Sequence, residues 1–149
     1  NLLNKLVINL KSFNFYILGY IHPLVDRELL KFLNRPNVFF LKKINYNELP
    51  SIYSSCHIGI IPYQEDNTHI KYSSPTKLHD YIAFNLKIVS TRIPYVEQFK
   101  NKYDDLSIAK NLDDFCIKIK KYEMIKKRSQ SLNFDNDWKA KKNKILEIF

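Results

Sequence analysis

Glycine is scarce in this chain of 149 residues, which contains only Gly19 and Gly59. An average protein has about 7% glycine. A Gly-x-Gly-x-x-Gly loop or a Walker loop needs glycines much closer together than these two, so the classical dinucleotide-binding and P-loop enzymes are excluded. A phosphate-binding site in this chain would have to be built without a glycine-rich loop.

Cysteine is equally scarce, and Cys56 and Cys116 lie far apart without a Cys-x-x-Cys motif. Such thiols favour a reduced intracellular compartment, so we expect a cytoplasmic protein. No metal is expected, because none of the histidines has the spacing of metal ligands; they are His22, His57, His69 and His79. No cofactor is expected either.

Long apolar runs are also missing, so neither a membrane-spanning helix nor a signal peptide is visible. A packed core is expected, since 45% of the residues are hydrophobic and 10 Phe and 10 Tyr are among them.

The net charge of +9 suggests an anionic partner, but it does not choose between nucleic acid, acidic lipid and a phosphorylated ligand. Stacking aromatics and a recognition helix are not evident, which disfavours nucleic acid.

Short apolar runs alternate with helical patterns along the chain. Strands are expected at 15–18, 37–41, 57–62, 87–91 and 105–109, and helices near 2–10, 23–33, 48–56, 74–84, 112–128 and 134–149. Nearly continuous apolar strands that alternate with helices are typical of a parallel sheet covered on both faces. The chain is therefore predicted to be one α/β domain, Rossmann-like, spanning 1–149 with a terminal helix at 134–149.

Ligands of an open parallel sheet bind beyond the carboxyl ends of its strands. The longest loop expected there runs from 63 to 73 and leads into a helix whose predicted N-cap is Ser74, followed by Pro75 and by Lys77 as third helical residue. Free N–H groups and Lys77 could hold a phosphate. The alternative is an ordinary capped helix with a solvent-facing lysine.

Asp80 follows Lys77 by three residues and Thr76 by four, so the three share one helix face. A carboxylate one turn below a phosphate site can accept hydrogen bonds from ribose hydroxyls. The alternative is an ion pair between Asp80 and Lys77 within the helix. The functional interpretation points to a nucleotide sugar or another nucleoside diphosphate.

Three stretches carry a resemblance to a known family: His57-Ile-Gly-Ile-Ile-Pro-Tyr63, Ser74-Pro-Thr-Lys-Leu-His-Asp-Tyr-Ile-Ala83 and Lys87-Ile-Val-Ser-Thr91. Their order and spacing resemble the C-terminal, donor-binding lobe of GT-B glycosyltransferases of the retaining group 1, family 4-like type. The resemblance covers almost the whole chain, with further matches at Ile17-Leu-Gly19, at 36–41, at 46–53 and around Trp138.

The resemblance implies transfer of a hexosyl-type sugar from a nucleoside diphosphate sugar, with Lys77 and Asp80 as the catalytic residues. It implies donor-binding positions at Gly19, Tyr46, Ser73, Ser74, Pro75 and Thr76. Glu65 and Thr68 of the 63–73 loop are further candidates for substrate binding: Glu65 or Asp66 could meet the sugar hydroxyls, and the alternative is a solvated loop. The resemblance also implies a preceding lobe with acceptor contacts and a further basic residue. A membrane-proximal or lipid-linked acceptor at the inner face of a membrane, in polysaccharide biosynthesis, would suit the basic tail.

The chain departs from the family pattern at three positions. Asp80 replaces a glutamate and is shorter by one methylene, Tyr72 stands where the first glutamate of the family's pair would lie, and Asn85 replaces a glycine. Asparagine is the best substitute for glycine at a left-handed helix end. The missing glutamate keeps open a second interpretation, a non-catalytic nucleotide-binding or interaction lobe.

Overall fold

The structure, a computed structural model, describes residues 2–20, 27–42, 44–63 and 68–124. The elements in chain order are α1 (Leu2–Asn9), β1 (Phe15–Gly19), α2 (Arg27–Leu33), β2 (Val38–Lys42), the 3₁₀ turn η1 (Tyr46–Glu48), α3 (Leu49–Ser55), β3 (Ile58–Ile61), α4 (Thr68–Lys71), α5 (Thr76–Ala83), β4 (Lys87–Ser90), α6 (Pro94–Glu97), β5 (Leu106–Ile108) and α7 (Leu112–Met124). The predicted helix at 134–149 and the predicted helix start at Pro23 lie outside the described residues.

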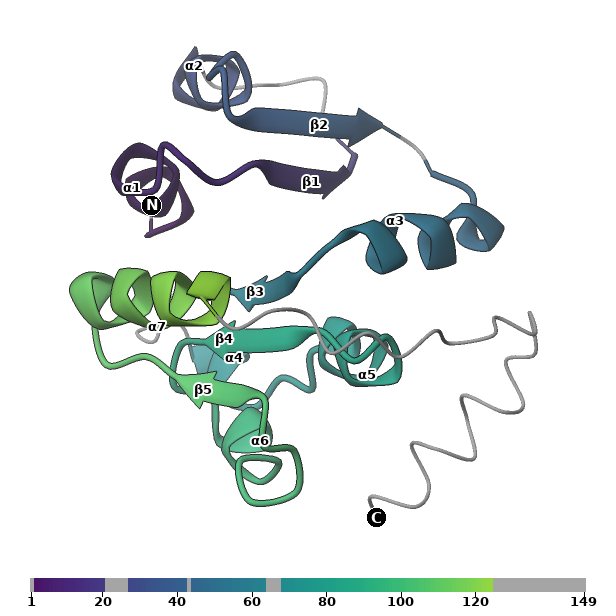
Figure 1. Cartoon of the computed structure of the whole chain (residues 1–149), viewed down its shortest axis with the longest axis vertical. Helices are drawn as coiled ribbons and strands as arrows, with labels where there is room; N and C mark the ends of the chain where they lie inside the picture. The colour runs from purple at the N-terminus through teal and green to yellow at the C-terminus, as the bar shows by residue number, and fades with distance from the viewer. Residues whose placement is uncertain (1, 21–26, 43, 64–67, 125–149) are drawn as a thin grey trace.

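The predicted Rossmann-like α/β class is confirmed, because the described strands pair in parallel and are flanked by helices (Figure 1). The strands do not form the one sheet that the sequence predicted. They divide into a two-stranded sheet, β1-β2, and a three-stranded sheet, β3-β4-β5. A cavity separates the two sheets, and side chains from both of them line it.

The β3–β5 sheet is covered on both faces, as the sequence predicted for the whole protein. Side chains that alternate along β4 enter two different cores: Ile88 packs on the side of α5 and α6, and Val89 packs on the side of α7. Both are fully buried. Leu78 of α5, Val96 of α6 and the residues Ile93 and Phe99 that flank α6 complete the first core.

The β1–β2 sheet is covered on one face. Phe15 and Val38 are buried against α1 and against Phe32 of α2. On the other face Tyr16 and Phe39, partners across the two strands, stack at 5.3 Å between ring centroids and stay 47% and 41% exposed.

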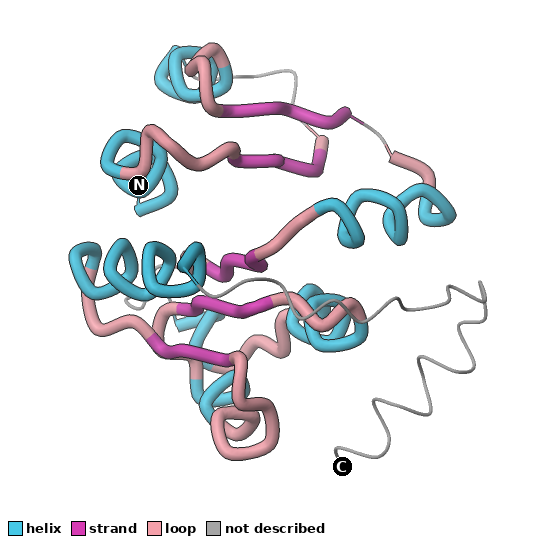
Figure 2. The backbone as a smooth tube through the Cα atoms, viewed as in Figure 1, coloured by secondary structure: helices cyan, strands magenta, loops and turns pink. Residues whose placement is uncertain are grey.

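The two units share one core, which joins α1 to α7. Leu6, Val7 and Leu10 of the first unit belong to the same buried cluster as Phe115 and Ile119 of α7. Figure 1 shows α1 and α7 on the same side of the molecule, and Figure 2 shows α3 and α5 together on the opposite side. The wall formed by α3 and α5 is the one that carries the candidate site.

The C-terminal end of α5 confirms the prediction for Asn85. This residue has a positive φ of 52°, the left-handed conformation that a helix end favours. Its N–H donates to the Ile82 carbonyl at 3.0 Å and the Leu86 N–H donates to the Tyr81 carbonyl at 2.9 Å. These two bonds make a Schellman motif, so Asn85 does what the family's glycine would do.

Candidate functional site

The start of α5 lies at the carboxyl end of β3, the edge where ligands of parallel sheets bind. The prediction that Ser74 is the N-cap is wrong. The helix begins at Thr76 after Pro75, whose extended ψ of 110° makes it the N-cap, and the Leu78 N–H donates to the Pro75 carbonyl at 2.9 Å. Lys77 is therefore the second helical residue, closer to the helix end than predicted.

Lys77 is half-buried and lies against an aromatic ring. Its Nζ is 5.0 Å from the centre of the Tyr63 ring, and Tyr63 follows β3 after one intervening residue, Pro62. In such a cation–π contact the ring face attracts the ammonium group and restricts its position. Lys77 forms no ion pair with Asp80 in the part of the chain that the structure describes, which removes the intrahelical ion-pair alternative.

Asp80 lies one turn further along α5 and contacts α3. The Tyr53 hydroxyl donates a hydrogen bond to Asp80 Oδ2 over 3.4 Å. Burial raises the pKa of Asp80, while the Tyr53 hydrogen bond and the neighbouring charge of His79 lower it. Burial and the Asp80 charge raise the pKa of Tyr53 to about 12, so this hydroxyl stays a proton donor at neutral pH.

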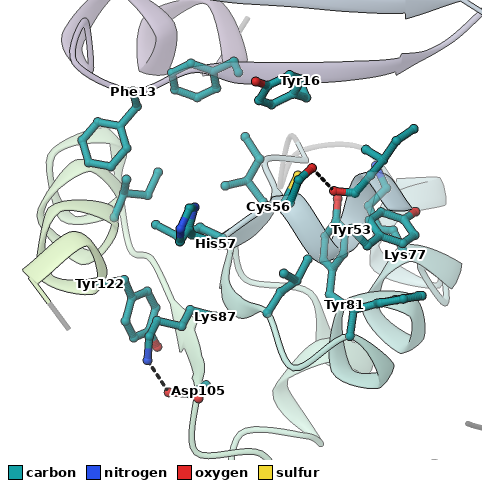
Figure 3. Close-up of a pocket in the computed structure, with 18 of the residues that line it drawn as sticks. Phe13, Tyr16, Tyr53, Cys56, His57, Lys77, Tyr81, Lys87, Asp105 and Tyr122 are labelled. Atoms are coloured by element: carbon teal, nitrogen blue, oxygen red, sulfur yellow. Dashed lines mark hydrogen bonds and ion pairs between the residues drawn. The ribbon is translucent and has the colours of Figure 1, made fainter. Parts of the chain in front are cut away.

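A cavity of about 1720 Å³ separates the two sheets, and Lys77 lies on its wall (Figure 3). Tyr53 and Tyr81 lie on the same side as Lys77, whereas Tyr16 enters from β1. Asp80, Ser74 and Thr76 are not among the described residues that line the cavity. The structure thus brings Lys77 to the cavity and sets Asp80 behind Tyr53.

A smaller cleft of about 280 Å³ lies at the carboxyl end of β1. Gly19, Tyr20, Ile44, Leu49 and Leu18 line it, and Leu18 also lines the large cavity, so the two hollows adjoin. This cleft brings Gly19 next to Ile44, which is two residues before Tyr46. Gly19 and Tyr46 are both donor-binding positions that the resemblance implied. Tyr46 begins η1 next to the cleft and is 58% exposed.

The other predicted binding residues are not brought into one site. Ser73 uses its hydroxyl locally, as a donor to the Ile70 carbonyl at 2.8 Å, and Pro75 is buried. Ser74 and Thr76 are exposed near the helix start. Glu65 and Asp66 lie outside the described residues, and Thr68 begins α4, a helical turn that the sequence predicted as part of a loop.

Sequence reasoning missed the aromatic residues around α5. Tyr53, Tyr63 and Tyr81 surround Lys77 and Asp80, and their rings come from different elements. The signal for Tyr63 was its position directly after a strand that ends in Pro62. No local pattern pointed to Tyr53, because its contact with Asp80 spans 27 residues of sequence.

Searches for a metal site and a membrane span give negative results for the described ranges. No group of three or more His, Cys, Asp or Glu side chains among these residues could hold a metal ion. None of the described helices has the length and apolar character required to cross a bilayer.

Comparisons with known protein families, with curated proteins and with solved structures give no match.

Proposed function

We propose that this chain is the donor-binding lobe of a retaining glycosyltransferase of the GT-B type, which takes a hexosyl-type sugar from a nucleoside diphosphate sugar. One observation carries the proposal. Lys77 lies at the N-terminal end of α5, at the carboxyl end of β3, and faces a cavity that adjoins the cleft at Gly19 and Ile44. A diphosphate bound there would meet a cation and a helix N-terminus together.

In the proposed mechanism the helix end and Lys77 stabilise the negative charge on the departing diphosphate. The Tyr63 ring already holds the Lys77 ammonium near the helix start. Lys77 would therefore stabilise the departing diphosphate without first having to be reoriented. The base would lie in the cleft lined by Gly19, Tyr20 and Ile44. Asp80 lines neither hollow, so the ribose would meet it past Tyr53, on the partly exposed side of this carboxylate.

A second lobe preceding this one belongs to the proposal and would supply acceptor contacts and a further basic residue. We place the enzyme in the cytoplasm, at the inner face of a membrane, with a membrane-proximal or lipid-linked acceptor and no nucleic-acid partner. The basic surplus of +9 supports an anionic surface nearby.

A second candidate function is a nucleotide-binding lobe without catalysis. Tyr72, which stands where the family's first glutamate would lie, is 81% exposed and offers no carboxylate. Binding of a nucleotide without turnover of any nucleoside diphosphate sugar by the full-length protein would favour this candidate over the enzyme.

Calorimetric titration of the full-length protein with UDP, GDP and ADP tests the proposal. We expect Lys77→Ala to weaken the tightest of these about tenfold or more, because a charge-assisted contact to phosphate is lost. Asp80→Asn should weaken it several-fold through the ribose. Lys31→Ala, which removes an equal charge from the exposed α2 pair with Glu28, is the matched control and should bind like the parent.

The proposal fails if none of the nucleotides binds. It also fails if Lys77→Ala and Asp80→Asn both bind like the parent. Equal losses of nucleotide affinity in Lys77→Ala and Lys31→Ala would mean that the nucleotide is bound by general charge attraction. That result would also contradict a site at α5.

A further inference from the structure

The contact between Tyr53 and Asp80 joins two elements that meet at the cavity wall. Tyr53 lies on α3 and lines the cavity, while Asp80 lies on α5 behind it. The hydrogen bond from the Tyr53 hydroxyl engages Oδ2 of the carboxylate. A carboxylate accepts through two oxygens, so Oδ1 keeps its capacity to accept a bond from a ligand hydroxyl.

We infer that Tyr53 is a positioning residue that holds the Asp80 carboxylate for the ribose hydroxyls of the bound nucleotide. The inference rests on the proposed function and deepens it. Asp80 has one methylene fewer than the glutamate of the resembling family, so it cannot reach as far from α5. A fixed partner on α3 compensates by restricting the short side chain to one orientation.

The Tyr53 ring is itself fixed by aromatic contacts at the end of α5. It meets the Tyr81 ring edge-on, with centroids 5.8 Å apart and an interplanar angle of 86°, and it meets the Phe84 ring at 5.1 Å. Tyr81 lies directly on the backbone of β3 at Gly59, where an added Cβ would be only 2.3 Å from Tyr81 Cδ2. A continuous series of contacts therefore connects β3 to the Tyr53 hydroxyl.

The charges around the pair agree with this role. Among the residues that the structure describes, the titratable groups that face Asp80 are Tyr53 of α3 and His79 and Tyr81 of α5. Burial raises the pKa of Asp80, and the Tyr53 hydrogen bond opposes that effect. The hydroxyl therefore helps to keep Asp80 ionised, which is the form that accepts hydrogen bonds from a ribose.

The test compares the tightest-binding nucleotide with its 2′,3′-dideoxy form on the full-length protein. The parent should prefer the nucleotide that has both hydroxyls, and Asp80→Asn should lose that preference. Tyr53→Phe should reduce the preference roughly fivefold, since a hydrogen bond to a charged group is lost. Tyr103→Phe is the control and should keep the preference, because it removes another hydroxyl from the lining of the same cavity, one that is bonded to the Leu86 carbonyl and not to Asp80.

Two further readouts separate positioning from a loss of stability. In Tyr53→Phe the pH at which binding falls off in acid should move upward, because the bond that lowers the pKa of Asp80 is gone. In the Asp80→Asn background Tyr53→Phe should add little, since the group that it positions is already changed.

The inference is overturned if Tyr53→Phe keeps the parent's preference and pH dependence while Asp80→Asn loses the preference. It is also overturned if Tyr53→Phe weakens binding by the same factor in the parent and in Asp80→Asn, since Tyr53 would then act without Asp80. A parent that binds none of the nucleotides contradicts the proposed function itself, and the two failures can be told apart.

Discussion

The β1–β2 unit and the β3–β5 unit are built from equally apolar strands, yet they bury them to different extents. Ile88 and Val89 of β4 are fully buried, whereas Tyr16 and Phe39 remain close to half exposed. The difference comes from coverage, because β4 has helices on both faces and strands on both edges, while β1 and β2 have helices on one face. A strand's apolar pattern therefore shows that it can be buried, and its neighbours decide whether it is.

The contrast matters for the candidate site, because its parts come from both units. Lys77, Asp80 and Tyr63 belong to the well-covered β3–β5 unit, and Gly19 and Ile44 belong to the unit with one open face. We expect the phosphate side to be the more rigid one, since a deeply packed core opens rarely.

The largest effect is expected from Phe115→Ala. Phe115 is fully buried in the core that joins α7 to α1 and β1, so its removal should cost about 3–5 kcal/mol of unfolding free energy. Urea unfolding measures this cost. Phe39→Ala in the open face is the matched control and should cost roughly 1 kcal/mol or less. Equal costs would contradict the difference between the two units.

An intermediate effect is expected from Gly59→Ala. The new methyl group would overlap the Tyr81 ring, so β3 and α5 must separate at a cost of about 1–3 kcal/mol. Thermal or urea unfolding measures the loss. In a Tyr81→Ala background the same substitution should cost much less, and an unchanged cost there would show that Tyr81 is not the obstacle.

The smallest effect is expected from Asp114→Asn at the start of α7. The Asp114 carboxylate accepts bonds from the Lys118 ammonium and from the Lys110 N–H, and these hold its pKa below the ordinary value of 3.8. A lowered folded-state pKa stabilises the protein above the unfolded value, and this stability is lost as pH falls below 3.8 through the folded-state pKa.

We therefore expect Asp114→Asn to cost about 0.5 kcal/mol at neutral pH, since the site is near the surface and screened by salt. The cost should shrink when urea unfolding is repeated at acid pH. A cost that stays constant from neutral to acid pH would contradict the role of the ionised carboxylate, and Asp113→Asn, an exposed neighbour on the same turn, is the control.

Local features were predictable where neighbouring residues alone create them. The left-handed helix end at Asn85 and the strands that alternate with helices follow from backbone preferences and apolar spacing. The helix start was predicted less well, since Ser74 was a suitable cap by type and the extended Pro75 took that position. The turn α4 inside a polar loop gave no apolar pattern to detect.

The candidate site was predictable in part. Lys77 lies at the start of a helix that follows a strand. Both the strand and the helix start could be predicted from the local sequence. The hydrogen bond between Tyr53 and Asp80 and the ring of Tyr81 on Gly59 were not predictable, because each depends on how α3 and α5 pack together.

The amino-acid sequence by itself determined the α/β class, the absence of glycine-rich phosphate loops and the helix start that carries Lys77. These depend on composition and on spacings of a few residues. The tertiary structure alone decided that the strands divide into two sheets and that the single glycine of β3 is the place where Tyr81 packs. It also decided that Asp80 lies behind Tyr53, because such contacts join residues that are distant in sequence and depend on the volume that side chains share in the core.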